Sequence, residues 1–324
     1  MARLTVNIAF SRDGRALREL QRVDSSGKDT FSGVRAITYV TATGTIRRVQ
    51  NLAANTMFFS ATTDGRNAIV SVQTGPAEDQ QHPFLVDTET GKMEGIPQGW
   101  LNSGPYPFVA ISGDGRLISI YSESRSEEEP LLVSVYSWRT KRLFARQTSG
   151  YIAASGMFGG LVTEDGMIEF WNNRFGGEIL DPKTGRLLVR VGAHSYRSVD
   201  GAWIVELPNP ILDNEPREAI IRSGRSGQTI GKLDLHIPDG EQGARWDWAR
   251  GAFCGRRGMF VTGTYDTVQA FEIPSGKKIA DFPVHAWRDP SVAKGDHTVV
   301  VACSSDGKRV AIRSGNRLTL HNLR

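Results

Sequence analysis

The chain has 324 residues, a net charge of +4 and a pI near 9.1, and hydrophobic residues make up 39% of it. This length is long for one ordinary domain but suits a unit built by repetition. No run of about 18 apolar residues occurs, so no transmembrane helix is expected. A charge this mild over this length argues against a dedicated nucleic-acid domain, in which basic residues gather on one face.

The first ten residues contain one basic residue and a short apolar stretch that Asn7 interrupts. No small-residue cleavage pattern follows, so we predict a strand rather than a signal peptide, and a cytoplasmic location by default. The next segment, residues 15–23, has apolar residues at positions 16, 17, 20 and 23, which is helical spacing. We nevertheless predict a strand here, because the segment follows a turn and tertiary pairing often overrides propensity.

Asp-Gly pairs recur along the chain at a nearly fixed interval. The pairs are Asp13-Gly14, Asp64-Gly65, Asp114-Gly115, Asp165-Gly166, Asp200-Gly201 and Asp306-Gly307, and Arg257-Gly258 occupies the remaining position. From the first glycine to the last, the mean interval is about 49 residues. Asp-Gly is a strong hairpin signal, because a tight turn needs the positive φ that glycine adopts at little cost. The repeat therefore predicts one such hairpin in each unit.

A second series of turns stays in phase with the first. Its members are Thr43-Gly44, Thr90-Gly91, Thr184-Gly185, Ser226-Gly227 and Ser275-Gly276, and Arg139-Thr140-Lys141 falls midway in the one double gap. The offset between the two series is 26 residues from Gly65 to Gly91, and again from Gly201 to Gly227. Short β-runs that repeat with a period in the forties are typical of the blades of a β-propeller.

Each unit is predicted to contain four strands, named a to d in chain order. Residues 108–111 exemplify strand a, 117–121 strand b and 84–87 strand c. The Asp-Gly turn joins a to b, and the second turn joins c to d. We therefore predict an all-β fold, a seven-bladed β-propeller of four-stranded antiparallel blades that occupies residues 1–324 as a single domain, with six or eight blades as the alternatives.

These units resemble the WD40 and YVTN-type propeller repeats. The resemblance lies in strings such as Ser112-Gly113-Asp114-Gly115-Arg116-Leu117 and Leu180-Asp181-Pro182-Lys183-Thr184-Gly185, and it covers nearly the whole chain. The Gly-His pair that opens WD40 repeats is absent, and Trp-Asp occurs once, at Trp246-Asp247, in a linking stretch. What the resemblance implies is the propeller architecture, and commonly a role as an interaction platform.

The sequence leaves two ways in which the ring can close. The last unit ends with strand c, residues 317–321, and its outer strand is missing. Residues 4–10 can either complete this last blade or begin the first one. Since a ring must close to avoid exposed edges, either one blade has three strands or the first blade is built differently.

The two cysteines, Cys254 and Cys303, occupy equivalent positions in adjacent units, each four residues before the turn glycine. Other units place apolar residues such as Phe10 and Ile111 at this position. A free cysteine packs as a small hydrophobic residue. We therefore expect two buried, reduced thiols of low reactivity, with a disulfide between them as the alternative.

Motifs for catalysis or metal binding are absent from the sequence. The histidines show no metal-ligand spacing, and no Cys-x-x-Cys, Gly-x-Ser-x-Gly or phosphate-binding loop occurs. We therefore predict no catalytic residue, no metal ligand and no cofactor. A site assembled from single residues of several blades would escape this kind of search.

The a–b and c–d turns share one face of the predicted ring, and the b–c and d–a connections share the other. We name these the tight-turn face and the long-loop face. The long connections are 73–82, 97–107, 122–130, 207–217, 236–251 and 284–297. Binding residues lie preferentially on long loops that a rigid scaffold carries.

Aromatic residues and arginines gather in or beside these long connections. The candidate binding residues are Trp100, Tyr106, Tyr151, Tyr196, Arg245, Trp246, Trp248, Trp287 and Arg288. Such residues dominate interface energetics, although aromatic rings also fill gaps between blades. We predict a non-enzymatic, monomeric scaffold that binds a protein or peptide on the long-loop face, with neither a membrane nor a specific nucleic acid as partner. The alternative is a propeller enzyme, a hydrolase or lactonase, with its site at the mouth of the central channel.

The basic pairs are short and separate along the chain, as at Arg47-Arg48 and Lys277-Lys278. Few phosphates can then be neutralised at once, so binding to nucleic acid should be weak and should collapse as salt is added. A filter-binding titration at low and at physiological salt tests this expectation. Submicromolar affinity that persists at physiological salt would contradict it.

Overall fold

The fold is seen in a computed structural model of the chain. The structure describes residues 3–23, 33–54, 56–74, 81–101, 108–122, 130–152, 158–163, 166–172, 176–192, 195–207, 218–235, 251–255, 258–263, 267–284, 299–315 and 317–323. Within these residues the one helix is the short η1 (Gln98–Trp100), and no helix has the length and hydropathy needed to cross a membrane.

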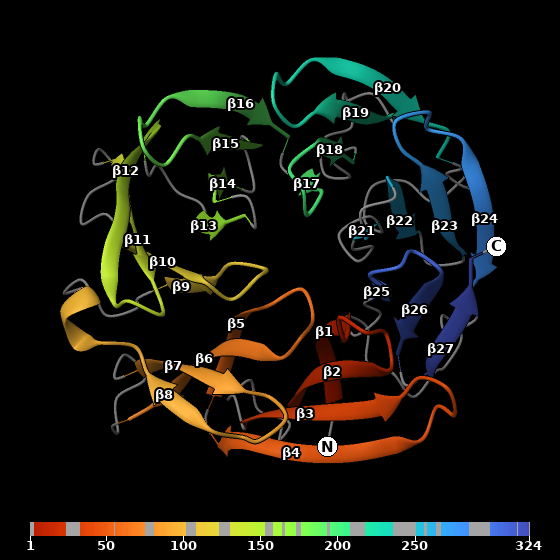
Figure 1. The fold of residues 1–324 in the computed structure, drawn as a ribbon, viewed down its shortest axis with the longest axis horizontal. Coiled ribbons are helices and arrows are strands. Elements are labelled where there is room, and N and C mark those ends of the chain that lie inside the picture. The colour runs from red at the N-terminus through yellow and green to blue at the C-terminus, as the bar shows by residue number, and fades with distance from the viewer. Residues whose placement is uncertain are drawn as a thin grey trace.

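Seven antiparallel sheets stand around a common axis (Figure 1). Blades 1 to 3 are β1 (Arg3–Phe10), β2 (Ala16–Val23), β3 (Gly33–Val40) and β4 (Ile46–Ala54); β5 (Thr56–Ala61), β6 (Asn67–Gln73), β7 (Gln81–Asp87) and β8 (Met93–Gly95); and β9 (Phe108–Ile111), β10 (Leu117–Ser122), β11 (Pro130–Ser137) and β12 (Arg142–Ile152). Blades 4 and 5 are β13 (Phe158–Val162), β14 (Ile168–Asn172), β15 (Gly176–Leu180) and β16 (Leu187–Val191); and β17 (Ser195–Arg197), β18 (Trp203–Glu206), β19 (Ala219–Ser223) and β20 (Thr229–Leu233). Blades 6 and 7 are β21 (Ala252–Cys254), β22 (Met259–Gly263), β23 (Thr267–Glu272) and β24 (Lys278–Pro283); and β25 (Val299–Cys303), β26 (Arg309–Ser314) and β27 (Arg317–Asn322). The prediction of a seven-bladed all-β propeller is confirmed.

The turns have the geometry that the repeat predicts. The glycines of both series have positive φ, for example +66° at Gly14 and +74° at Gly91. In the double gap Lys141 takes the place of the glycine, with a φ of +58°, the one positive value at a non-glycine among the described residues. A side-chain hydrogen bond also stabilises the Asp-Gly turns. Ser11 Oγ donates to Asp13 Oδ1 at 2.6 Å, and the same bond recurs between Ser112 and Asp114.

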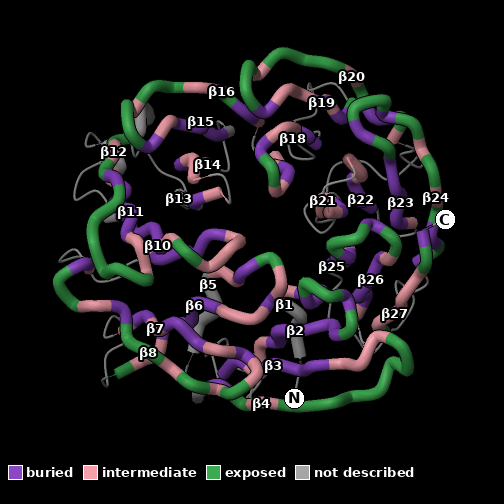
Figure 2. Tube along the Cα trace, viewed as in Figure 1, coloured by how far each residue is buried: buried purple, intermediate pink, exposed green. Residues whose placement is uncertain are grey.

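The core lies between neighbouring blades. The middle strands are buried and the outer strands face solvent (Figure 2). Each apolar cluster joins two blades: Leu20 and Ala36 of blade 1 pack with Ala68, Val70 and Val86 of blade 2. The segment 16–23, which has helical spacing, is strand β2, and six of its eight residues are buried, so burial on both faces of the blade explains the spacing.

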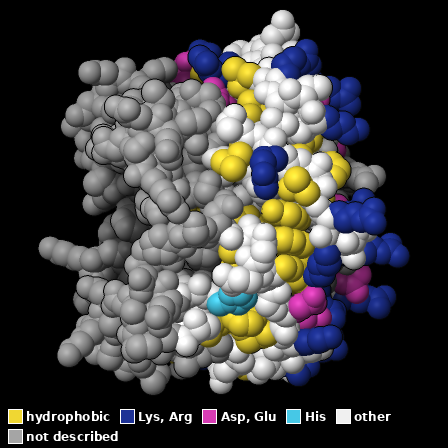
Figure 3. Space-filling view, turned by 90° about the vertical axis from the view of Figure 1, so that its left-hand side faces the viewer, with side chains coloured by type: hydrophobic (Ala, Val, Ile, Leu, Met, Phe, Trp, Pro, Cys, Tyr) yellow, Lys and Arg dark blue, Asp and Glu magenta, His cyan; other side chains and the backbone are white. Residues whose placement is uncertain are grey.

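The outer strands of blades 1, 3, 4, 5 and 6 share a β-bulge just after the c–d turn. In blade 3, Tyr136 pairs with Leu143 and Val135 with Ala145, which leaves Phe144 without a cross-strand partner. The same register shift falls at Arg47, Leu188, Ile230 and Ile279. Several large apolar side chains are therefore exposed on the outer wall, close to the Lys and Arg side chains at its edge (Figure 3).

The ring closes by contact between blade 7 and blade 1. Residues 4–10 belong to β1 and begin the first blade, and blade 7 has three strands among the described residues. The buried carboxylate of Glu19 accepts from Arg313 Nε at 3.0 Å and from Tyr39 Oη at 2.6 Å. Burial raises the pKa of Tyr39, and the hydrogen bond to Glu19 adds to this effect, so the phenol stays protonated as the donor.

Cys254 and Cys303 form a disulfide, so the expectation of two reduced thiols is wrong. The physical reason is the geometry of the ring. Inner strands β21 and β25 lie side by side at the axis, and equivalent positions in adjacent blades approach to 4.7 Å between Cα atoms. This separation is within the range that a disulfide spans.

Removal of this bond should destabilise the fold. The bond closes a 49-residue separation, and a loop of that size contributes about 2–4 kcal/mol to the free energy of unfolding. We expect the Cys254→Ala/Cys303→Ala variant to lose about this much in denaturant titrations. The parent protein, unfolded in denaturant without a reducing agent, should not react with an alkylating reagent, because both cysteines are in the disulfide. Labelling of two thiols in that sample would contradict the bond.

Candidate functional site

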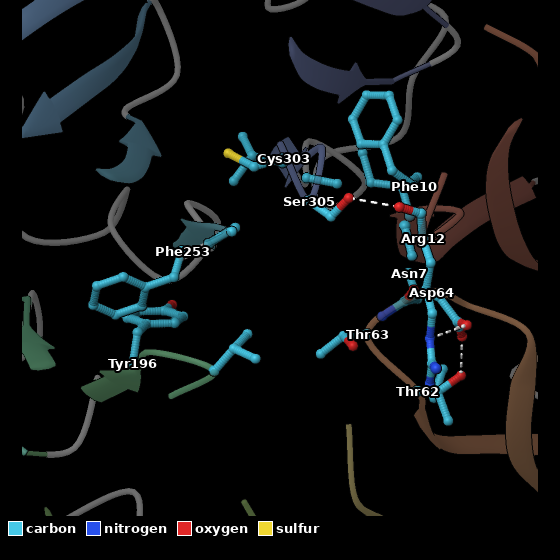
Figure 4. Close-up of a pocket in the computed structure, with 18 of the residues that line it drawn as sticks. Asn7, Phe10, Arg12, Thr62, Thr63, Asp64, Tyr196, Phe253, Cys303 and Ser305 are labelled. Carbon is cyan, nitrogen blue, oxygen red and sulfur yellow. Dashed lines mark hydrogen bonds and ion pairs between the residues drawn. The ribbon is translucent and has the colours of Figure 1, made fainter. Parts of the chain in front are cut away.

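A cavity of about 940 Å³ lies at the centre of the ring, on the side of the a–b turns. Its wall is formed by the inner strands β1, β5, β17, β21 and β25 and by a–b turns of blades 1, 2, 3, 5, 6 and 7. The inner strands converge on the axis, so residues far apart in the sequence face one space (Figure 4). A cavity of this size accommodates a small-molecule ligand.

Charged groups stand at the rim of the cavity. Arg12 Nε lies 3.3 Å from Asp64 Oδ2, which links the first turn of blade 1 to that of blade 2. Arg116 Nε lies 3.1 Å from Asp114 Oδ2 within the turn of blade 3. The arginine side chains are 73% and 83% exposed, so these pairs are solvated and each contributes little to stability.

The rim carboxylates are held by their own turns. Asp64 Oδ1 accepts from Thr62 Oγ1 at 2.7 Å and from the Arg66 amide at 3.0 Å. Asp306 Oδ1 accepts from Ser304 Oγ at 2.5 Å and from the Lys308 amide at 3.0 Å, and these two bonds lower the pKa of Asp306. One oxygen of each carboxylate is thus used in closing a hairpin. Among the described residues, no group of three His, Cys, Asp or Glu side chains has the geometry to hold a metal ion.

The opposite side of the cavity is aromatic. Tyr196 and Phe253 lie across from Arg12 and Asp64 (Figure 4). Both rings pack on the buried Phe260, with centroids 5.6 and 5.1 Å away. The cavity therefore offers one apolar side for a flat or aliphatic group and one charged side for a polar group.

The predicted binding residues are not brought together in the described part of the chain. Tyr196 lines the cavity, and Trp100 is 9% exposed and stacks on Tyr136 with centroids 4.2 Å apart. For Trp100, burial fits the interpretation that the ring fills a gap. Tyr151 belongs to β12, but its side chain is outside the description, and Tyr106, Arg245, Trp246, Trp248, Trp287 and Arg288 lie outside the described residues.

Sequence reasoning missed the charged rim. Asp64 and Asp114 were interpreted as turn formers, which they are, but they also line the cavity. Their position in the repeat could have indicated this second role. The a–b turns join the two innermost strands of each blade, so the residues of all these turns must lie close to the axis of the ring. Arg12 and Ser305 precede the Asp of their turns and meet across the junction of blades 1 and 7, where Ser305 Oγ donates to the Arg12 carbonyl at 2.7 Å.

The long connections depart from the opposite ends of the strands. Strand β2 ends at Val23 before β3 begins at Gly33, and β18 ends at Glu206 before β19 begins at Ala219. In an antiparallel blade these ends lie on the face away from the a–b and c–d turns. The separation of the two kinds of connection follows directly from the strand order.

No protein-family model matches the chain, and no curated protein resembles it in sequence at a significant level. The fold itself, seven antiparallel blades around one axis, is that of a β-propeller. Propellers carry many functions, so the architecture is compatible with a protein-binding scaffold and with an enzyme.

The Asp-Gly turns should make stability depend on acid pH. The lowered pKa of Asp306 means that its contribution is present above the ordinary Asp pKa of about 4 and is lost as the pH falls through the folded-state value. Asp306→Asn should therefore flatten the acid limb of a plot of Tm against pH. The matched control is Asp234→Asn, which alters an exposed carboxylate outside the Asp-Gly turns. If Asp306→Asn and the parent show the same loss of Tm at acid pH, the Asp306 carboxylate does not stabilise the fold.

Proposed function

We propose that this propeller is a non-enzymatic scaffold that binds a protein or peptide through its long-loop face. The observation that carries the proposal is the division of the connections. Turns of the tight-turn face are closed by glycine and by Ser–Asp or Asp–amide hydrogen bonds, whereas all the long connections leave from the other face. A rigid ring that carries its long loops on one side is the arrangement in which binding usually resides.

The composition of those connections supports a macromolecular partner. Trp246, Trp248, Arg245, Trp287 and Arg288 belong to the two segments that flank blade 6 in the sequence. These residue types supply most hot spots in protein interfaces. The resemblance of the turn strings to WD40 and YVTN-type repeats points to the same role, and we propose that the chain is a divergent repeat protein of that kind that acts as a monomer.

A propeller enzyme is the second candidate, and the central cavity is the observation that favours it. The rim carries Arg12, Asp64, Asp114 and Arg116, which would bind a small charged molecule. Against this, Asp64 and Asp114 are already engaged with arginines and with their turns. Cavity walls that are aromatic on one side fit binding of a side chain or small ligand equally well.

The location bears on both candidates. A cytoplasmic location remains a proposal from the sequence, whereas the disulfide between Cys254 and Cys303 favours an oxidising compartment, where such bonds persist. Fractionation followed by alkylation of the endogenous protein would decide between the two.

Replacing Trp246 or Trp287 by Ala tests the scaffold. If these rings belong to the binding surface, each variant should lose about 2 kcal/mol of affinity for its partner and keep the melting temperature of the parent. A ring that fills the core would instead cost about 3–5 kcal/mol of stability. The measurement pairs a melting curve with a quantitative pull-down from source extract. Lys277→Ala, an exposed change on the tight-turn face, is the control, and loss of the partner in that variant would reverse the assignment of the faces.

A further inference from the structure

Strand β27 is the outermost strand of blade 7 among the described residues, whereas the third strand of every other blade is paired with a fourth (Figure 1). Leu318 and Leu320 of β27 pack against the apolar cluster of blade 1 but are only half-buried. The residues at these two positions are buried in all the other blades: Ala36 and Thr38, Pro83 and Leu85, Val133 and Val135, Gly177 and Ile179, Ala219 and Ile221, and Val268 and Ala270. Without a fourth strand, an apolar surface is therefore left open at the edge of blade 7.

The backbone of β27 offers hydrogen bonds at the same edge. The Leu323 amide donates to the Lys308 carbonyl, next to β26, at 2.7 Å. Bonds between two antiparallel strands fall on alternate residues, so the amides and carbonyls of Leu318, Leu320 and Asn322 point away from β26. No strand of the described part of the chain lies beyond them. We name these three residues the β27 edge.

Outer strands elsewhere pack an apolar side chain against the third strand of the next blade. Phe282 of β24 and His321 of β27 have ring centroids 4.7 Å apart, and Leu233 of β20 shares a cluster with Phe271 of β23. Tyr39 of β3 occupies the corresponding position in blade 1 and is half-buried. Within the described residues, no outer strand of blade 7 covers it.

The turn glycines mark the same gap. Three of them lie against a side chain from the outer strand of the preceding blade: Gly91 against Gln50, Gly185 against Gln147 and Gly227 against Val189. A β-carbon added to Gly44, the corresponding glycine of blade 1, would meet no described atom within 4 Å. The space that a preceding outer strand fills beside those three turns is therefore open beside the turn of blade 1.

The wall of blade 1 next to this gap is apolar. Val49 of β4 pairs with Ile37, two residues before Tyr39, so Val49 lies on the face that Tyr39 turns towards blade 7. The Val49 side chain is 49% exposed. The corresponding residues in the outer strands of blades 3 to 6 are charged: Arg146, Arg190, Lys232 and Asp281. An exposed valine in place of a charged residue fits a surface that a further strand covers.

We propose that the β27 edge binds an extended segment of a partner protein, which adds to blade 7 as its fourth strand. The segment would run antiparallel to β27 and form backbone hydrogen bonds with Leu318, Leu320 and Asn322. It would also cover Tyr39 and the apolar wall of blade 1. This surface lies on the outer wall of the ring, so the proposal goes beyond the function proposed for the long-loop face.

The complete blades indicate which side chains the segment carries. Opposite the position of Leu320, the outer strands of blades 3 to 6 have small or short side chains: Ala145, Val189, Gly231 and Ala280. Opposite the position of Leu318, those of blades 4 to 6 have larger apolar ones: Val191, Leu233 and Phe282. A charged residue lies between the two. We therefore expect a small residue, a polar residue and a large apolar residue, in that order along the segment.

The charge at the edge extends this pattern by one residue. Arg317, which begins β27, is exposed and makes no ion pair within the described part of the chain. Because directly opposed residues of an antiparallel pair lie on one face, an acidic residue of the segment would face Arg317. That acid follows the large apolar residue, which would itself contact Tyr39 as Phe282 contacts His321.

The position of β27 favours a flexible segment over a second copy of the ring. The neighbouring blades 6 and 1 each continue one strand further out, to β24 and β4. A second ring would bring its edge strand together with a whole blade, which these two outer strands would obstruct. Every described strand of this chain already belongs to a blade, so none is free to be exchanged.

The test uses a labelled peptide of about six residues, in which alanine, threonine, phenylalanine and glutamate follow one another between flanking threonines. Fluorescence anisotropy measures binding, and amide hydrogen exchange locates it. We expect exchange at Leu318, Leu320 and Asn322 to slow about tenfold or more when the peptide is bound. N-methylation of the alanine and phenylalanine amides should weaken binding about tenfold or more, because both amides face β27 and each loses a hydrogen bond.

A charge exchange tests the register. Arg317→Glu should weaken binding about fivefold, and lysine in place of the glutamate of the peptide should restore it. The matched control is Arg225→Glu, which makes the same change of net charge in the exposed turn of blade 5 and should have little effect. Both side chains are exposed, and unchanged melting curves verify folding.

Three outcomes would overturn the proposal. The peptide does not bind the parent or does not slow exchange at the β27 edge; or the N-methylated peptide binds as tightly as the unmodified one; or the three amides are already protected in the free protein, so that another segment of this chain or a second copy occupies the edge. Sedimentation separates these last two occupants. Trp246→Ala and Trp287→Ala should leave peptide binding unchanged, which separates this result from that for the long-loop face.

Discussion

The structure depends on the meeting of its first and last blades. Within the described residues these blades share no strand, so the ring is held at this junction by side chains. Glu19 is fully buried and takes Arg313 and Tyr39 as partners, and an apolar cluster that includes Phe10, Leu17 and Val300 lies beside them. Loss of one partner from a buried ion pair costs about 3–5 kcal/mol, because the remaining charge is uncompensated. This contact joins the two blades whose inner strands, β1 and β25, both form part of the wall of the central cavity.

The fold was predictable because two series of turns independently indicate the same repeating unit. A glycine with positive φ at the hairpins fixes where strands begin and end, and the seven turns of the first series give the number of blades. Lys141 shows how strong this constraint is, since a residue that rarely adopts positive φ does so where the repeat requires it. Periodicity failed as a guide at residues 16–23, where burial on both faces erases the alternation expected of a strand.

The candidate sites were less predictable, because they depend on which blades are neighbours. Cys254 and Cys303 occupy equivalent positions, and only the closeness of adjacent inner strands turns that equivalence into a bond. Likewise the c–d turn of blade 4 meets Gln147 of the outer strand of blade 3 only because the two blades are neighbours in the ring. Trp100 is of a residue type that is common in binding surfaces, but it packs on Tyr136. Residue type alone does not distinguish a ring that binds a partner from a ring that fills a gap between blades.

The repeated bulge has a consequence for self-association. An outermost strand offers unpaired backbone amides and carbonyls along its whole length. Two flat edge strands of this kind, from two molecules, readily form hydrogen bonds with each other. In blades 1, 3, 4, 5 and 6 the extra residue near the start of the outer strand interrupts that row and increases the local twist. Blade 2 lacks the bulge, but its outer strand β8 is only three residues long. The outer strands of these six blades therefore expose apolar side chains while presenting few stretches of backbone on which a second ring could add its own sheet.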